Sequence, residues 1–146
     1  MISKFAKFLI GETMKKILFV LAMALTLNGS EINWIHTYKE AASVAKKENK
    51  PMVIYMHRPG CESCDFLEEK VFKDTALATY LNEHYVPTLL NVSKSDAPKH
   101  LIVSASPVFH FVNAKGEKIE ETQYGGKNAK AFLKILQNVE AKFTKQ

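Results

Sequence analysis

The apolar positions along the chain follow two spacings, one typical of helices and the other of buried strands. Residues 34–49 carry apolar side chains three and four positions apart, which predicts an amphipathic helix that Pro51 ends. Residues 51–56 form a continuous apolar run, which is typical of a strand buried on both faces. Helical spacing resumes after a short polar break and continues to about residue 72.

The rest of the chain predicts two further helices and three strands. In chain order they are a helix, three strands and a helix, at residues 76–84, 85–92, 107–112, 117–123 and 127–143. Pro87 favours an edge position for its strand, and turn residues at 113–116 join the last two strands as a hairpin. This order predicts an α/β domain, with a central mixed sheet of about four to five strands flanked by helices on both faces.

Composition fits one globular domain and narrows the range of partners. The 146 residues are 47% hydrophobic and 24% charged. The formal net charge is +5, of which +3 falls in residues 1–30. Basic residues do not gather into a patch with interleaved aromatic residues, so a nucleic-acid partner is not expected. We also expect no cofactor, no metal and a monomeric protein.

Residues 1–30 have the pattern of a targeting signal. A short basic stretch, Met14-Lys15-Lys16, precedes an eleven-residue apolar run at 17–27 and small residues at 28–30. This pattern predicts a secretory signal peptide, because a membrane span needs about 20 residues. We interpret residues 14–30 as the signal peptide.

Two further interpretations follow for the ends of the domain. Residues 1–13 are interpreted as an over-long gene start, and residues 31–146 as the folded domain. No Ala-x-Ala precedes Glu31, so a form tethered to the membrane by an uncleaved signal stays an alternative. Export predicts a periplasm-like, oxidising compartment.

The candidate chemistry lies in the two cysteines of the chain, in the motif Cys61-Glu62-Ser63-Cys64. A strand, a short turn and then C-x-x-C at the start of a helix favour a redox motif over half of a zinc site. The helix N-terminus would stabilise a Cys61 thiolate, and Cys64, one turn later, can form the disulfide. Arg58 would add positive potential, whereas Glu62 would raise the pKa of the thiol.

Other interpretations of the cysteines stay open. The pair could be a structural disulfide, or it could bind a metal together with His57, His100 or His110. A copper-binding or copper-delivery module would be one such protein, and a redox-inert adaptor is another alternative. His57 could instead tune the pKa of Cys61.

The motif and its surroundings resemble the thioredoxin superfamily, and more closely its exported thiol:disulfide interchange proteins. The resemblance rests on the strand order, on Cys61-x-x-Cys64 and on Ser106-Pro107 before the third strand, and it covers residues 34–143. It implies that Cys61 is an exposed nucleophile and Cys64 a buried resolving thiol. It also implies that Pro107 is a cis-proline facing the disulfide, and that the backbone of Ser106 pairs with a substrate.

The chain departs from this family pattern at three places. Gly60 replaces a tryptophan before the first cysteine, Glu62-Ser63 replaces Gly-Pro, and Tyr55 replaces a buried acid. We expect Tyr55 to be a core aromatic residue, since its ordinary pKa of about 10 makes it a poor base near neutral pH.

These observations predict a periplasmic thiol–disulfide oxidoreductase. The Cys61–Cys64 pair would reduce or exchange disulfides in exported proteins that contain cysteines, and a membrane-bound electron donor would keep it reduced. The acidic residue next to Cys61 favours a reductant or isomerase over a strong oxidant.

Overall fold

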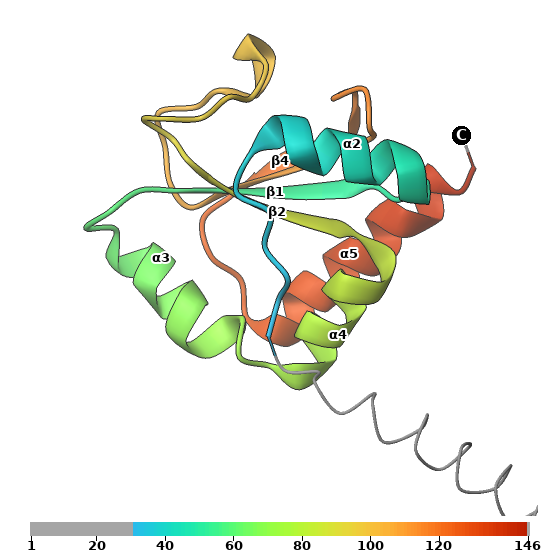
Figure 1. Cartoon of the computed structure of the whole chain (residues 1–146). Coiled ribbons are helices and arrows are strands. Elements are labelled where there is room, and N and C mark those ends of the chain that lie inside the picture. The colour runs from blue at the N-terminus through green and yellow to red at the C-terminus, as the bar shows by residue number, and fades with distance from the viewer. Residues whose placement is uncertain (1–30, 146) are drawn as a thin grey trace, which may run out of the picture.

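The computed structural model describes residues 31–145, so the predicted signal peptide lies outside the described residues. The helices and strands follow the predicted order (Figure 1). The elements are α2 (Tyr38–Glu48), β1 (Met52–His57), α3 (Glu62–Phe66), a π-helical turn (Leu67–Val71), α4 (Thr75–His84), β2 (Val86–Asn91), a 3₁₀ turn (Lys99–Leu101), β3 (Val108–Val112), β4 (Lys118–Tyr124) and α5 (Ala129–Phe143). Among these helices none is long and apolar enough to cross a membrane.

The described residues form a mixed four-stranded sheet in the order β2-β1-β3-β4. β1 pairs in parallel with β2, whereas the β1–β3 and β3–β4 pairs are antiparallel. The mixed sheet predicted from the sequence is therefore confirmed. β2 is the outermost strand on its side, as Pro87 predicted, and only a single bridge from Ile35 to Thr88 continues the pairing beyond it.

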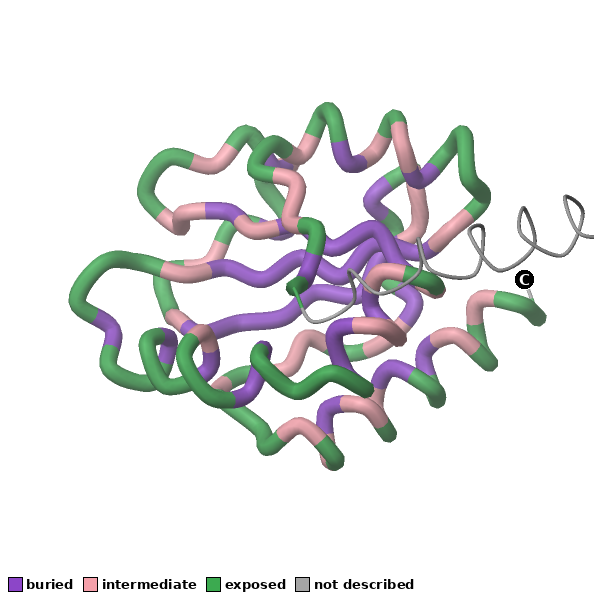
Figure 2. The backbone as a smooth tube through the Cα atoms, turned by 60° about the horizontal axis from the view of Figure 1, so that its bottom comes forward, coloured by how far each residue is buried: buried purple, intermediate pink, exposed green. Residues whose placement is uncertain are grey.

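β1 lies at the centre of the sheet and is buried on both faces. Residues 52–56 are all fully buried, as the continuous apolar run predicted (Figure 2). Alternate side chains point to opposite faces of a strand, so β1 supplies two separate cores. Val53 and Tyr55 pack on the face covered by α3, α4 and α5, and their neighbours pack on the face covered by α2. Burial of each large apolar side chain stabilises the folded state by about 1.5–3 kcal/mol relative to leaving it exposed.

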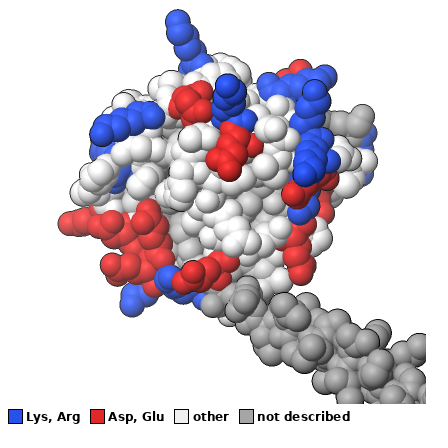
Figure 3. Space-filling model, in the orientation of Figure 1, with Lys and Arg blue, Asp and Glu red and all other residues white. Residues whose placement is uncertain are grey.

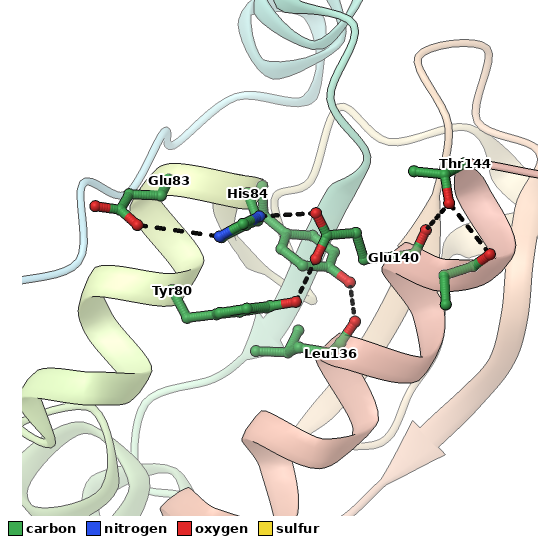
Figure 4. A network of polar contacts seen from close by, with 8 residues as sticks. Tyr80, Glu83, His84, Leu136, Glu140 and Thr144 are labelled. Carbon is green, nitrogen blue, oxygen red and sulfur yellow. Dashed lines mark hydrogen bonds and ion pairs between the residues drawn. The ribbon is translucent and has the colours of Figure 1, made fainter.

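Polar contacts join α4 to α5 on the first of these faces (Figure 4). Glu140 of α5 accepts a hydrogen bond from the Tyr80 hydroxyl, and its Oε1 lies 2.7 Å from Nδ1 of His84. The Tyr85 hydroxyl donates to the Leu136 carbonyl at 2.6 Å. These contacts fix the two helices against each other beneath the sheet.

Two helices differ from their predicted forms. The first helix begins at Tyr38 and not at residue 34, because Thr37 caps it in an extended conformation. Trp34 instead packs beside Tyr55 and Phe72. The helix after the cysteines changes from α to π geometry at Leu67, which alters the direction of the side chains that follow.

The connection between β2 and β3 is anchored to the rest of the domain at two points. The Asp96 carboxylate accepts hydrogen bonds from the backbone N–H groups of Tyr38 and Lys39, at 2.7 and 3.0 Å. Nε2 of His100 lies 2.9 Å from the Gly116 carbonyl oxygen. Because this connection leads into Ser106-Pro107, its anchors also restrain the residues that precede β3.

The first prediction concerns Asp96. Partial burial opposes its ionisation, but the backbone N–H groups that it binds outweigh burial and lower the pKa of the carboxyl group. A lowered pKa in the folded state stabilises the protein above the ordinary Asp value of about 3.9, and the stabilisation disappears as pH falls through the lowered pKa. We expect Asp96→Ala to decrease the free energy of unfolding by about 0.5–1 kcal/mol at pH 7, since the cap is exposed to solvent.

Urea denaturation of the wild type and the variant at pH 7, 5 and 3 measures this difference. It should be constant between pH 7 and 5 and smaller at pH 3. Asp96→Asn is the matched control, because it keeps one acceptor oxygen without a charge and should show less pH dependence. A difference between wild type and Asp96→Ala that grows at pH 3 would contradict the assignment.

Candidate active site

Cys61 and Cys64 form a disulfide at the start of α3, with their Cα atoms 5.2 Å apart. Cys61 is the N-cap residue, and the backbone N–H of Cys64 donates to its Sγ at 3.3 Å. This is the contact expected when a helix N-terminus stabilises negative charge on a sulfur. Cys61 is 9% exposed and Cys64 1%, so Cys61 is the more accessible sulfur but is less exposed than the resemblance implied.

Ser106-Pro107 lies at the same end of the sheet as the cysteines. The Ser106–Pro107 peptide bond is cis. Val108, the next residue, pairs with Met56 near the end of β1, so the start of β3 adjoins the loop that leads to Cys61. The Ser106 side-chain oxygen is buried, and it has no hydrogen-bond partner within the described part of the chain.

A third segment completes this end of the molecule. The backbone N–H of Gly125 donates to the Pro107 carbonyl at 2.9 Å. The next residues along the chain line an open hollow of about 370 Å³ together with residues between the two cysteines. The hollow is lined by Glu62, Ser63, Phe66, Gly126, Lys127 and Asn128. The proline and the turn before α5 are thus joined at the end of the sheet where the cysteine helix begins.

Arg58 and Glu62 flank Cys61 along the chain, and both side chains are exposed. Glu62 lies in the first turn of α3, where a carboxylate interacts favourably with the helix dipole. Among the ion pairs and hydrogen bonds of residues 31–145, none joins either side chain to Cys61. Any effect that they have on the cysteine therefore acts through space.

The structure adds Glu68, a residue that the sequence analysis missed. Tyr55 is buried in the core as predicted, stacked on Phe109 with ring centroids 5.1 Å apart. Its hydroxyl donates to Oε1 of Glu68 at 3.0 Å, and Nδ1 of His57 lies 3.5 Å from the same oxygen. Burial raises the pKa of Tyr55 far above its ordinary value, and the Glu68 charge raises it further, so the hydroxyl stays a donor.

Glu68 is an acidic residue close to Tyr55, which occupies the position where the family has its buried acid. Its only sequence signal is its place four residues after Cys64, which in a helix puts two side chains on one side. The π-helical turn that contains it cannot be recognised from the residue pattern. The family's buried acid is therefore replaced here by a buried tyrosine that is hydrogen-bonded to a partly exposed carboxylate.

Within residues 31–145, none of the three candidate histidines forms a metal-binding group with the two cysteines. His110 is paired with Ile54, so it points to the α2 face, whereas the cysteines pack on the opposite face. Its Nδ1 lies 2.9 Å from the Thr122 hydroxyl. Burial, together with the charge of Lys118, lowers its pKa to about 4, so it is neutral at pH 7.

The remaining two histidines have other contacts. His57 lies beside Glu68, and His100 lies beside the Gly116 carbonyl. In the part of the chain that the structure describes, no three His, Cys, Asp or Glu side chains are grouped to hold a metal ion. The copper arrangement that combines Cys61 and Cys64 with His110 is therefore not assembled in this fold.

Comparisons with known proteins agree with this geometry. The model of the thioredoxin-like domain family matches residues 38–140. Anterior gradient protein 3 of Xenopus tropicalis is 30% identical over 73 residues, which are 50% of this chain and 43% of that protein. The match thus spans less than half the length of that relative.

Solved structures extend the likeness to most of the described residues. A candidate disulphide-isomerase from Bacteroides thetaiotaomicron is 27% identical, with a TM-score of 0.65, and the match covers 77% of this chain and 95% of that one. A thioredoxin from Thermus thermophilus shares the fold, with a TM-score of 0.62 at 23% identity over 75% of this chain and 87% of that one. By its fold, its C-x-x-C disulfide and the match to the family model, the chain belongs to the thioredoxin-like domain family.

Proposed function

We propose that this protein is an exported thiol–disulfide oxidoreductase that reduces or exchanges disulfides in other exported proteins. The observation that carries the proposal is the Cys61–Cys64 disulfide at the N-terminus of α3, with the Cys64 N–H directed at the Cys61 sulfur. A structural disulfide needs no such stabilisation of the sulfur that lies nearer the surface.

The reaction takes place in two exchanges. The Cys61 thiolate attacks a substrate disulfide, so that a Cys61–substrate disulfide forms, the substrate disulfide breaks and one substrate sulfur leaves as a thiolate. The Cys64 thiolate then attacks Cys61, forming the Cys61–Cys64 disulfide and releasing the second substrate thiolate. In one cycle two electrons pass from the protein to the substrate. A dithiol donor then supplies two electrons that reduce the Cys61–Cys64 disulfide again. The same steps in reverse oxidise a substrate dithiol.

The chain's own groups divide this work according to burial and position. The Cys64 N–H stabilises negative charge on Cys61, both in the attacking thiolate and when Cys61 leaves. Cys64 is almost fully buried, so it reaches only a sulfur already bound to Cys61. Ser106 and Pro107 lie at the same end of the sheet as the disulfide and would place the substrate backbone, as the resemblance implies.

The second prediction separates the two cysteines. Cys61→Ser should abolish reduction of a disulfide substrate such as insulin, because no accessible thiolate remains. Cys64→Ser should keep the first exchange but lose the second, so it should accumulate mixed disulfides that thiol reductants release. Non-reducing gel electrophoresis and peptide mass spectrometry measure both. Equal trapping by both variants would overturn the assignment of roles.

The third prediction concerns redox direction. The N-terminus of α3 favours the Cys61 thiolate, but Glu62 and Asp65 place negative charge in the same turn. We therefore propose that the dithiol is less acidic than that of a strong oxidant and that the protein acts as a reductant. Equilibration with glutathione buffers should give a reduction potential nearer to about −270 mV than to about −120 mV. A value near the second figure would show an oxidant.

Export and a membrane-bound electron donor are parts of the same proposal. They rest on the basic and apolar pattern of residues 14–30, which is typical of a secretory signal peptide. In an oxidising compartment the disulfide is the stable form, so a reductant there needs electrons supplied from the membrane.

The fourth prediction tests export of the full chain. Leu21→Arg puts a charge in the apolar stretch and should retain the protein in the cytosol of a bacterial host, whereas Leu21→Ile should not. Fractionation followed by mass measurement locates the protein and shows whether it begins near Glu31. Recovery of both variants and the wild type in the cytosol would contradict export.

A further inference from the structure

The helix that carries the cysteines presents an acidic surface to solvent beside them. Glu62, Asp65, Phe66 and Glu69, here termed the α3 face, are all exposed and lie on α3 and on the π-helical turn that follows it. Asp65 and Phe66 follow Glu62 by three and four positions, a spacing that places side chains on one side of a helix. Phe66 is 58% exposed, which makes it one of the few large apolar side chains of the described domain that are open to solvent.

The charge of the α3 face is opposite to that of the domain. Residues 31–146 carry sixteen Lys and Arg against fourteen Asp and Glu, a net charge of +2. Residues 62–71, in contrast, carry four acidic residues and a single lysine. Asp and Glu side chains gather at the lower left of Figure 3, where α3 lies in the same view in Figure 1.

Stabilisation of the helix by acidic residues at its N-terminus explains only part of the charge of the α3 face. Glu62 and Asp65 lie in the first turn, where acidic side chains complement the helix dipole. Glu69 lies beyond that turn, in the π-helical segment, where the favourable interaction with the N-terminal end of the helix dipole has fallen off. Within the described residues, none of these three carboxylates takes part in an ion pair, whereas Glu68 lies beside His57.

The hollow described above adjoins the α3 face. Phe66 and Glu62 form one side of it, and Gly126, Lys127 and Asn128 form the other. Glu62 and Ser63 separate the two cysteines along the chain, so a side chain bound in the hollow contacts the residues between them. An exposed aromatic residue surrounded by charged residues beside a hollow is typical of a surface that binds another protein.

We propose that the α3 face and the hollow bind the segment around the reacting cysteine of a substrate protein, and that they favour segments with Lys or Arg and an apolar side chain near that cysteine. This inference rests on the proposed function and names its substrate class. The acidic face attracts the basic side chains and raises the association rate. Phe66 would contact the apolar side chain, and Lys127 confines the negative potential to the α3 side of the hollow.

A second copy of the chain is a less suitable occupant. The domain is net positive elsewhere, so a copy could dock a lysine-rich surface on the α3 face. Such a dimer would cover the hollow beside the residues between the cysteines and hinder exchange with other proteins. A substrate segment, which must approach Cys61 in any case, fits both the charge and the position of the face.

The fifth prediction uses three disulfide peptides that differ only beside the cysteine, with two Lys, two Ser or two Glu. We expect the reduced protein to react with the Lys peptide at least about tenfold faster than with the Glu peptide at low salt. The ratio should fall towards one at about 0.5 M salt, because exposed charges are screened. Stopped-flow measurement of the second-order rate constants gives the ratio directly.

Variants identify the side chains responsible for the preference between the Lys and Glu peptides. Asp65→Asn/Glu69→Gln should bring the Lys-to-Glu ratio close to one, whereas the matched pair Glu83→Gln/Glu117→Gln, exposed on other elements, should leave it unchanged. Phe66→Ser should reduce the advantage of a peptide with Leu next to the cysteine over one with Ser there. Circular dichroism establishes that each variant is folded.

The outcomes separate this inference from the proposed function. Absence of exchange with the Ser peptide would contradict the oxidoreductase itself. Normal exchange with the Ser peptide but a Lys-to-Glu ratio near one in the wild type would overturn the inference alone. A ratio that persists in Asp65→Asn/Glu69→Gln would also overturn it. So would sedimentation that shows a dimer at low salt, made monomeric by these substitutions, without any peptide preference.

Discussion

Burial of β1 on both of its faces is the constraint on which the rest of this structure depends. Its residues are fully buried from Met52 to Met56, and they alternate between the two cores. A strand with no solvent-facing side must have neighbours on both edges and helices on both sides. β2, β3 and the surrounding helices meet that requirement. The same strand ends at His57, four residues before Cys61, so the cysteine loop begins directly after a buried strand.

The position of the disulfide follows from this arrangement. The cysteine helix follows the end of β1, and the antiparallel partner β3 starts at the same end, which puts Pro107 at the same end of the sheet as the cysteines. The face of the cysteine helix that packs against the sheet carries Cys64, Leu67 and Val71, which are buried. The outer face of this helix carries the acidic residues and Phe66. One short helix thus presents a buried sulfur to the core and a charged surface to solvent.

Much of the candidate site could be predicted because its signals are local. The cysteine spacing, the strand before it and the helix after it lie within about twenty residues, and the cap contact at Cys61 follows from any helix that begins there. Glu68 could not be found in this way. Its partner Tyr55 lies on another element, and the turn that directs Glu68 towards it has π geometry without a distinct residue pattern.

The sequence by itself determined the order of helices and strands, the mixed sheet with its buried central strand, and the cysteine pair at a helix start. These features depend on side-chain periodicity and on backbone preferences that act over a few residues. The tertiary structure alone decided that Asp96 caps the first helix, that His110 points away from the cysteines and that Glu68 binds Tyr55. Each of these depends on which distant segments the fold brings together, and a pattern of hydrophobic residues records that a side chain is buried but not which partner it meets.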